Sequence, residues 1–279
     1  MLSYRHAFHA GNHADVLKHI VLMLALDHLK QKPKPLWYID THAGAGCYAL
    51  DSAEADKNAE YRGGIAQLLR HRDELPALLA PYLAALETGD ADALRTYPGS
   101  PLFAASRLDA DDRLRLFELH PQDRPLLAQT FAGDRRAVVA ASDGFASQKA
   151  LLPTPSRRAL VLIDPPYELK EDYARVVASL RDALRRFATG VYLVWYPLLP
   201  RAESRNLPRQ LAELSVPALR IELQVCREPR EFGMFGSGMW VIHPPWRLRA
   251  QMQTLLPLLQ QWLGVAGEAA FVLEETGCG

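Results

Sequence analysis

The segment 159–167, with the sequence ALVLIDPPY, most constrains what this chain can fold into. Its first five residues form a continuous apolar run, which is typical of a strand buried on both faces of a parallel sheet. Asp164 ends this run, and the two prolines that follow fix φ and supply no N–H for further ladder hydrogen bonds. The segment therefore predicts a buried strand that stops abruptly and leaves a carboxylate at the carboxyl end of a sheet. Ligands of open α/β sheets bind at such ends.

Strand and helix patterns alternate along most of the chain. Strands are expected at 36–40, 113–119, 137–142, 159–164 and 190–196, and helices at 12–30, 121–131, 145–151 and 172–187. This alternation predicts an α/β protein with a mostly parallel sheet that helices cover on both faces. The segments 218–226 and 237–246 are expected to pair as an antiparallel edge near the C-terminus, followed by a last helix over 251–263.

The segment 51–94 interrupts this pattern, since it is rich in Ala and Leu and is divided by Pro76 and Pro81. We expect it to be a helical insertion subdomain, with residues 1–50 and 95–279 forming the main domain. The sequence YPGSP at 97–101 introduces a further helix, in which Ser100 is expected to be the N-cap and Pro101 to occupy the first turn.

Composition restricts the class of protein. The 279 residues are 49% hydrophobic and 23% charged, which fits a soluble globular protein. Because 32 basic and 32 acidic side chains balance, any nucleic-acid contact must come from local patches. The 3 cysteines are too few and too scattered for a disulfide framework, so we expect a cytoplasmic protein. No apolar run approaches the roughly 20 residues of a membrane helix, so no membrane association is expected.

Acidic residues stand at the ends of four expected strands: Asp40, Glu118, Asp143 and Asp164. Carboxyl ends of parallel strands meet at one edge, so these acids are expected to line one crevice. Glu118 could accept both hydroxyls of a ribose, and Asp143 could accept a hydrogen bond from an adenine amino group. A phosphate-rich ligand would be repelled there, whereas a cationic ligand with a ribose and an adenine would fit. S-adenosylmethionine meets that description.

The motifs DTHAGAG (40–46), FELH (117–120), SDGF (142–145) and DPPY (164–167), in this order, resemble S-adenosylmethionine-dependent methyltransferases that modify exocyclic amines of nucleic-acid bases. The N-terminal MLSYRHAFHAGNHADVLKH resembles one family in particular, RlmJ, the adenine-N6 methyltransferases of 23S ribosomal RNA. YPGSP, LIDPPYE and RFATGVYLVWYP are similar to that family too. One departure is HPPW at 243–246, where the family has NPPW.

The resemblance implies a class I, Rossmann-like methyltransferase fold, S-adenosyl-L-methionine as cofactor and 23S ribosomal RNA as substrate. It implies a cofactor site lined by Lys18, His19, His42, Ser100, Glu118, Asp143, Gly144 and Asp164. Apart from the resemblance, Tyr4 and His6 are expected to reach over the target base or its phosphate. Either Lys18 or His19 could meet the carboxylate of the cofactor.

The chemistry of adenine methylation explains the DPPY motif. The exocyclic nitrogen is a poor nucleophile, because its lone pair is delocalised into the ring. Asp164 and the carbonyl of Pro165 are expected to accept its two N–H groups and localise that lone pair. Asp164 would also stabilise the developing positive charge and take the departing proton. Tyr167 is expected to stack on the target base, which must be flipped out of any helix.

Other readings remain open from the sequence. A DNA adenine or cytosine methyltransferase would share the same crevice, although no composition shift marks a target-recognition domain. A non-catalytic RNA-binding protein could keep the fold, and a protein-glutamine methyltransferase could use a similar motif. His6, His9, His13 and His19 are closely spaced, but no cysteine or paired carboxylate completes a metal site, so no metal is expected. A monomer is expected, and HPPW is expected to be a turn that ends an edge strand.

Overall fold

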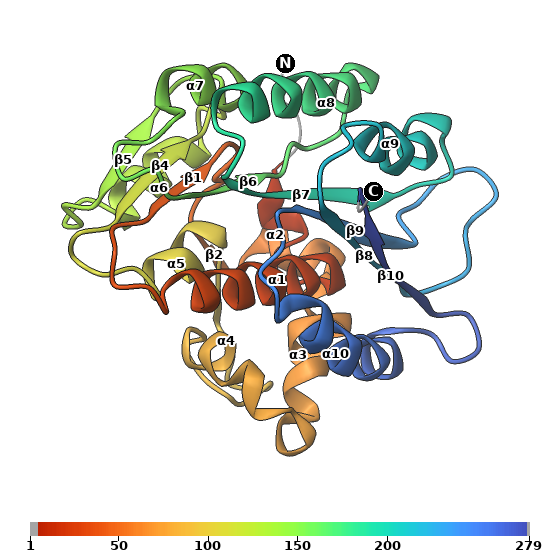
Figure 1. The fold of residues 1–279 in the computed structure, drawn as a ribbon. Coiled ribbons are helices and arrows are strands. Elements are labelled where there is room, and N and C mark those ends of the chain that lie inside the picture. Colours follow the sequence, from red (N-terminus) through yellow and green to blue (C-terminus); the bar gives the residue numbers. More distant parts are fainter. Residues whose placement is uncertain (1–4, 278–279) are drawn as a thin grey trace.

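The computed structural model describes residues 5–277, which are built around an eight-stranded sheet with the order β10-β8-β9-β7-β6-β1-β4-β5 (Figure 1). Its strands are β1 (Trp37–Asp40), β4 (Arg113–Phe117), β5 (Ala137–Ala140), β6 (Ala159–Ile163), β7 (Val191–Leu198), β8 (Ala218–Gln224), β9 (Gly236–Ile242) and β10 (Ala270–Thr276). β1 lies between β4 and β6, and pairing stays parallel outward to β5 and β7. The predicted mostly parallel sheet is therefore confirmed.

The C-terminal strands add the predicted antiparallel pairing in a different order. β8 and β9 pair antiparallel, as expected, but β9 also pairs antiparallel with β7 and so lies inside the sheet. β10 pairs antiparallel with β8 and forms the edge. Sequence analysis missed β10, because this strand has only seven residues, is partly exposed and ends in three polar residues.

Helices cover both faces of the sheet (Figure 1). α7 (Gly144–Leu151), α8 (Lys170–Arg186) and α9 (Ala202–Ala212) lie on one face, and α1 (His13–Leu29), α5 (Ser100–Ala105) and α10 (Leu248–Leu263) on the other; α6 (Asp123–Thr130) packs against β5. The apolar run of β6 is continuous because both faces of this strand are buried. Leu160 and Leu162 join the core under α1, whereas Val161 and Ile163 join the core under α8. Sequence analysis missed α9, which has Pro208 in its interior.

The segment 51–94 consists of short helices, as predicted, and α3 and α4 lie below α1 in Figure 1. These are α2 (Ala53–Asn58), α3 (Ile65–Arg70), α4 (Ala80–Ala84) and the 3-10 turns Glu60–Gly63, Arg72–Glu74 and Ala77–Leu79; a further 3-10 turn, His6–Phe8, precedes α1. An antiparallel pair, β2 (Cys47–Ala49) and β3 (Thr96–Pro98), joins the two ends of the insertion. Its apolar side chains share one core with α1, and its separation as a subdomain stays a prediction.

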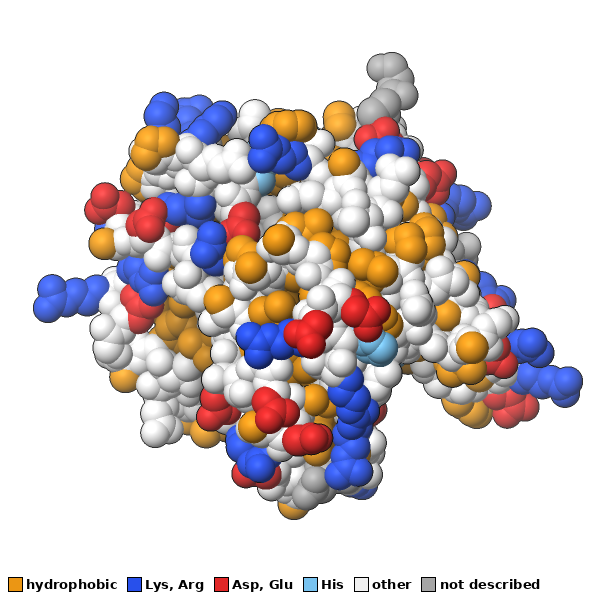
Figure 2. Space-filling view, turned by 90° about the horizontal axis from the view of Figure 1, so that it is seen from below, with side chains coloured by type: hydrophobic (Ala, Val, Ile, Leu, Met, Phe, Trp, Pro, Cys, Tyr) orange, Lys and Arg blue, Asp and Glu red, His pale blue; other side chains and the backbone are white. Residues whose placement is uncertain are grey.

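Charged side chains of both signs are interspersed over the face seen from below, with hydrophobic side chains between them (Figure 2). This mixture agrees with the formal net charge of zero. No helix among residues 5–277 is long and apolar enough to cross a membrane.

Candidate active site

A cavity of about 940 Å³ opens at the carboxyl ends of β1, β4, β5 and β6, beside the first half of α1. Its size is at the upper end for small-molecule sites. The predicted site residues that line it are His6, Lys18, His19, His42, Ser100, Glu118, Asp143, Gly144, Asp164, Pro165 and Tyr167. Tyr4 lies outside the described residues. Residues distant in sequence therefore meet in one place, as the pattern of strand ends predicted.

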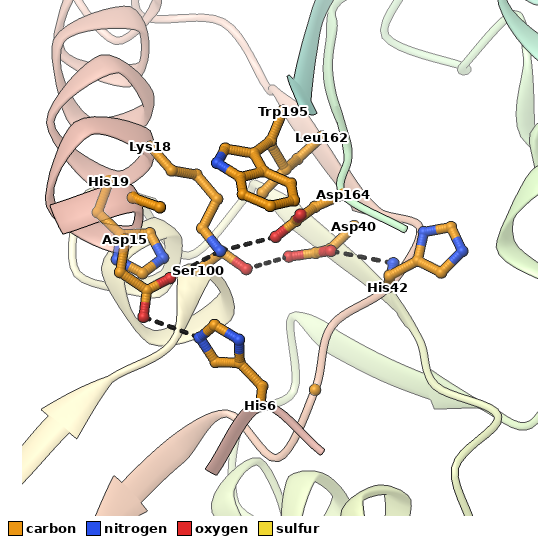
Figure 3. Close-up of polar contacts among 12 residues, drawn as sticks. His6, Asp15, Lys18, His19, Asp40, His42, Ser100, Leu162, Asp164 and Trp195 are labelled. Carbon is orange, nitrogen blue, oxygen red and sulfur yellow. Dashed lines mark hydrogen bonds and ion pairs between the residues drawn. The ribbon is translucent and has the colours of Figure 1, made fainter. Parts of the chain in front are cut away.

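Asp164 follows the last residue of β6 and points toward α1, where Lys18 meets it (Figure 3). The Nζ atom of Lys18 lies 2.7 Å from Oδ2 of Asp164 and 2.8 Å from Oδ1 of Asp15. Oδ2 of Asp15 is 2.8 Å from Nε2 of His6 and also accepts the backbone N–H of Gly11. Four side chains thus form a chain of ionic and hydrogen-bonded contacts from the N-terminal turn to the end of β6.

Burial makes this network strongly electrostatic. Burial alone would lower the pKa of Lys18, but the carboxylates of Asp15 and Asp164 outweigh it and hold that pKa well above its ordinary value. Burial would likewise raise the pKa of Asp15, but His6 and Lys18 hold it well below its usual range. Lys18 is therefore a fixed cation between two carboxylates. Its expected contact with the cofactor stays a prediction.

Asp40 lies below the cavity floor, which differs from the expectation that four acids line the crevice. Its side chain is fully buried and accepts hydrogen bonds from the hydroxyls of Tyr38 and Ser100, each at 2.6 Å. Burial raises the pKa of Asp40 to about 6. Ser100 is also not the N-cap of α5, which is Gly99, because the Ser100 hydroxyl is committed to Asp40. The predicted capping role was wrong, and Ser100 fixes the floor of the cavity instead.

Glu118 and Asp143 follow β4 and β5 and face the cavity with different partners. Glu118 accepts the backbone N–H of Gly44 at 2.8 Å and that of His120 at 2.6 Å, and burial raises its pKa. Asp143 is the N-cap of α7 through Phe145 N and also accepts from Arg175 at 2.6 Å. Both carboxylates are therefore held in place, and that of Asp143 already forms an ion pair with the guanidinium of Arg175.

Gly44 and Gly144 belong to the loops that wall this part of the cavity. Gly44 has φ +62°, and a Cβ there would stand 2.1 Å from the hydroxyl of Tyr48. A Cβ at Gly144 would stand 2.0 Å from the carbonyl oxygen of Thr41. Neither position can hold a side chain without moving the loops, so the backbone itself forms the wall.

His19 and His42 are both neutral side chains of the cavity wall. Burial lowers the pKa of His19 well below its ordinary value and lowers that of His42 to about 4. His19 Nδ1 lies 2.8 Å from the hydroxyl of Tyr97, whereas its buried Nε2 has no hydrogen-bond partner among the described residues. His42 packs edge-on against Phe145.

Tyr167 borders the cavity, but its ring is buried, with 2% of the residue exposed. Its hydroxyl donates to the carbonyl oxygen of Trp195 at 2.7 Å, and its ring packs against Tyr173. The predicted stacking of Tyr167 on a base stays a prediction, and in this structure no open ring face supports it. Trp195, which sequence analysis missed, stands above Asp164 and lines the cavity (Figure 3).

The comparisons with known proteins agree with this geometry. A family model described as "Ribosomal RNA large subunit methyltransferase D, RlmJ" matches residues 33–273. The chain belongs to the RlmJ family. Two curated relatives, each called ribosomal RNA large subunit methyltransferase J, come from Escherichia coli K12 and Haemophilus influenzae. The first is 49% identical over 96% of both chains, and the second is 47% identical over 98% of both.

A crystal structure of a Legionella pneumophila protein superposes on this RlmJ-family chain with a TM-score of 0.90 and 36% identity, covering 97% of this chain and 99% of that one. The resemblance found in the motifs is thus confirmed, and so is the class I methyltransferase fold that it implied. Among the described residues, no group of three His, Cys, Asp or Glu side chains is arranged to hold a metal ion.

Asp15 and Trp195 are two residues of this RlmJ-family site that sequence analysis did not find. Asp15 precedes Lys18 by three positions, a spacing that places two side chains on one face of a helix. That spacing was an available signal. No sequence signal marked Trp195, because each apolar residue of a strand buried on both faces is expected to belong to the hydrophobic core.

Proposed function

We propose that this chain transfers the methyl group of S-adenosylmethionine to the exocyclic N6 of an adenine in 23S ribosomal RNA. The observation that carries the proposal is Asp164, held by Lys18 at the end of β6 in a cavity of about 940 Å³. The names of the curated relatives support ribosomal RNA as the substrate. A cytoplasmic, monomeric enzyme that needs no metal belongs to the same proposal.

The residues of the cavity fit S-adenosylmethionine. Glu118 would bind the ribose hydroxyls, and Asp143 the adenine amino group, while acids along the wall suit a sulfonium cation. The unpartnered Nε2 of His19 supplies a further polar atom, and the walls at Gly44 and Gly144 allow backbone contact. When bound, the cofactor supplies an electrophilic methyl group to an in-line nucleophile.

Asp164 is the residue that acts on the target amine. Lys18 occupies Oδ2, and no described residue is hydrogen-bonded to Oδ1, so this oxygen is available to accept an N–H of the base. The carbonyl of Pro165 would accept the second N–H. Together they would localise the nitrogen lone pair, and the carboxylate would stabilise the positive charge that develops on nitrogen. Asp164 would then accept the departing proton.

Trp195 and the N-terminal turn would handle the base. The indole of Trp195 lies next to Asp164, with the Lys18 ammonium 5.9 Å from its ring centroid, so it would offer a stacking face to a flipped adenine. His6 would join the base or its phosphate while fixed by Asp15. Tyr4 keeps the substrate role predicted from the sequence, and Tyr167 would border the base with its buried ring rather than stack on it.

The test is transfer of labelled methyl from S-adenosylmethionine to 23S RNA, to DNA and to ribosomal protein, with Asp164→Ala protein beside the wild type. The proposal expects label in adenine of the RNA alone. Label in DNA would favour a DNA methyltransferase, and label in protein would favour a glutamine methyltransferase. RNA binding without any transfer would favour a non-catalytic RNA-binding protein.

A further inference from the structure

A second cavity lies at the amino ends of the parallel strands, at the end of the sheet opposite the active site. β9 runs antiparallel to β7, with Ile242 opposite Tyr192, so its end and the HPPW turn lie at the amino ends of the parallel strands. HPPW is a turn, as predicted, but the strand that it ends, β9, lies inside the sheet and is not the expected edge strand. His243 in this turn adopts φ +52°. The cavity has a volume of about 320 Å³ and opens at this end of the sheet, between the end of α1 and the start of β6.

This cavity is basic. Lys32, Lys34, Arg157 and Arg158 line it, and none of them forms an ion pair with an acid among the described residues. Elsewhere on the chain most buried or half-buried cations have such partners; Lys30, only two residues away, binds both Asp109 and Asp112. In a chain without net charge, four cations around one cavity form a local site for an anion.

The cavity is structurally fixed by one of these cations. The guanidinium of Arg158 donates to the backbone carbonyls of Leu29, Lys32 and Lys34. It therefore fastens the turn after α1 to the start of β6 and holds the backbone that carries the two lysines. Lys32, Lys34 and Arg157 are exposed, so their charged groups are accessible at the rim.

An exposed aromatic ring adjoins the cavity. Trp246, the last residue of HPPW, is 72% exposed, and the guanidinium of Arg247 lies 4.6 Å from its ring centroid. His28, which lines the cavity, packs edge-on against Trp246, with the two ring centroids 6.3 Å apart. The pKa of His28 is lowered by burial and then by the positive charges of Arg247 and Lys32. The cations of the cavity and those beside the ring thus act on the same histidine.

We propose that this end of the sheet is a second RNA-binding surface, in which the basic cavity binds a backbone phosphate and Trp246 stacks on an unpaired base next to it. Such a combination of cations and an open ring is the usual means of binding single-stranded RNA. The inference rests on the proposed function, because the occupant is a part of the same RNA. Ten residues of α1 separate Lys18 from His28, or about 15 Å, so the segment bound here is not the target adenine.

The experiment measures binding of in vitro transcribed 23S RNA across a series of salt concentrations. Lys32→Ala/Lys34→Ala should weaken binding about tenfold at moderate salt and make the salt dependence shallower by about 1 in slope, since the contact to one phosphate is lost. Trp246→Ala should also weaken binding about tenfold, but with the salt slope unchanged, since stacking releases no counterion. Affinity for S-adenosylmethionine should stay at the wild-type value in both.

The matched control is Arg181→Ala/Arg185→Ala, which removes two cations from α8 that have no ion-pair partner among the described residues. It should leave RNA affinity within about twofold. Wild-type RNA binding by the cavity variants, or an equal loss in the α8 control, would overturn the inference. If inorganic phosphate binds the wild type but not the cavity variants, and RNA affinity is unchanged, the site takes a free anion instead. Absence of methyl transfer by the wild type would overturn only the proposed function, because the binding comparison does not depend on it.

Discussion

The Nζ atom of Lys18 lies 2.7 Å from Oδ2 of Asp164, and this contact joins residues 146 positions apart. Lys18 comes from α1, which precedes the whole sheet, and Asp164 ends the central strand β6. The same ammonium binds Asp15, so one buried cation holds two carboxylates in the site. The orientation of the proposed catalytic carboxylate therefore depends on the packing of α1 against the sheet.

Lys18→Met should slow methyl transfer by about 100-fold, because Asp164 loses the contact that orients it and small displacements of reacting groups cost that much. It should also destabilise the fold by about 3–5 kcal/mol, since it leaves buried carboxylates without their cation. Single-turnover kinetics and denaturant unfolding measure the two effects.

Lys30→Met is the control for that variant, because Lys30 lies on the cap of the same helix and also bridges two aspartates. It should lose stability without losing the rate of the folded enzyme. Equal slowing in both variants would mean that Lys18 acts only through stability.

Asp40→Asn tests the buried acid under the cavity. The folded pKa of Asp40 is about 6, above its unfolded value, so the native state binds its proton more tightly. This contribution to stability is present below the unfolded pKa of about 3.9 and is lost as pH rises to about 6. Between pH 4 and 7 the stability of the variant should therefore improve by about 2 kcal/mol relative to the wild type. A difference that does not change with pH in denaturant titrations would contradict the assignment.

Glu118→Gln should weaken binding of S-adenosylmethionine by about 1–3 kcal/mol, the scale of a hydrogen bond to a charged group. The amide keeps the size of the side chain but loses the charge that would accept two ribose hydroxyls. Titration calorimetry measures the affinity, with the exposed Glu171→Gln on α8 as control. An unchanged dissociation constant for Glu118→Gln would remove Glu118 from the cofactor site.

Trp195→Ala should weaken productive binding of the RNA by about 1–3 kcal/mol, the range for loss of one stacked base. It should raise KM for RNA and leave cofactor affinity unchanged, whereas Trp195→Phe should retain most of the binding. Steady-state kinetics with varied RNA separate these effects. If alanine and phenylalanine behave alike, the ring is not a stacking platform.

The sequence predicted those parts of the fold and site that are encoded locally. β6 and the position of Asp164 follow from one apolar run and two prolines, and α1 follows from its helical spacing. The motif order also led to the correct family.

Contacts that depend on tertiary packing could not be predicted in the same way. Ser100 looked like a helix cap, but its hydroxyl is bound to Asp40, 60 positions away. The place of β9 between β7 and β8 depends on how the last three strands order themselves, and hydrophobic pattern alone does not specify that order. The open side of the Trp195 ring likewise depends on which loops leave space above it.

The central claim is that Asp164 acts directly on the target amine. The most direct measurement is a single-turnover methyl-transfer assay on 23S RNA with Asp164→Asn and Asp164→Ala, run beside calorimetric titration of S-adenosylmethionine. The account predicts that transfer falls at least about 100-fold in both variants, while the fold and most of the cofactor affinity are retained. Near-normal transfer by Asp164→Ala protein would contradict it, because the cavity would then work through another residue.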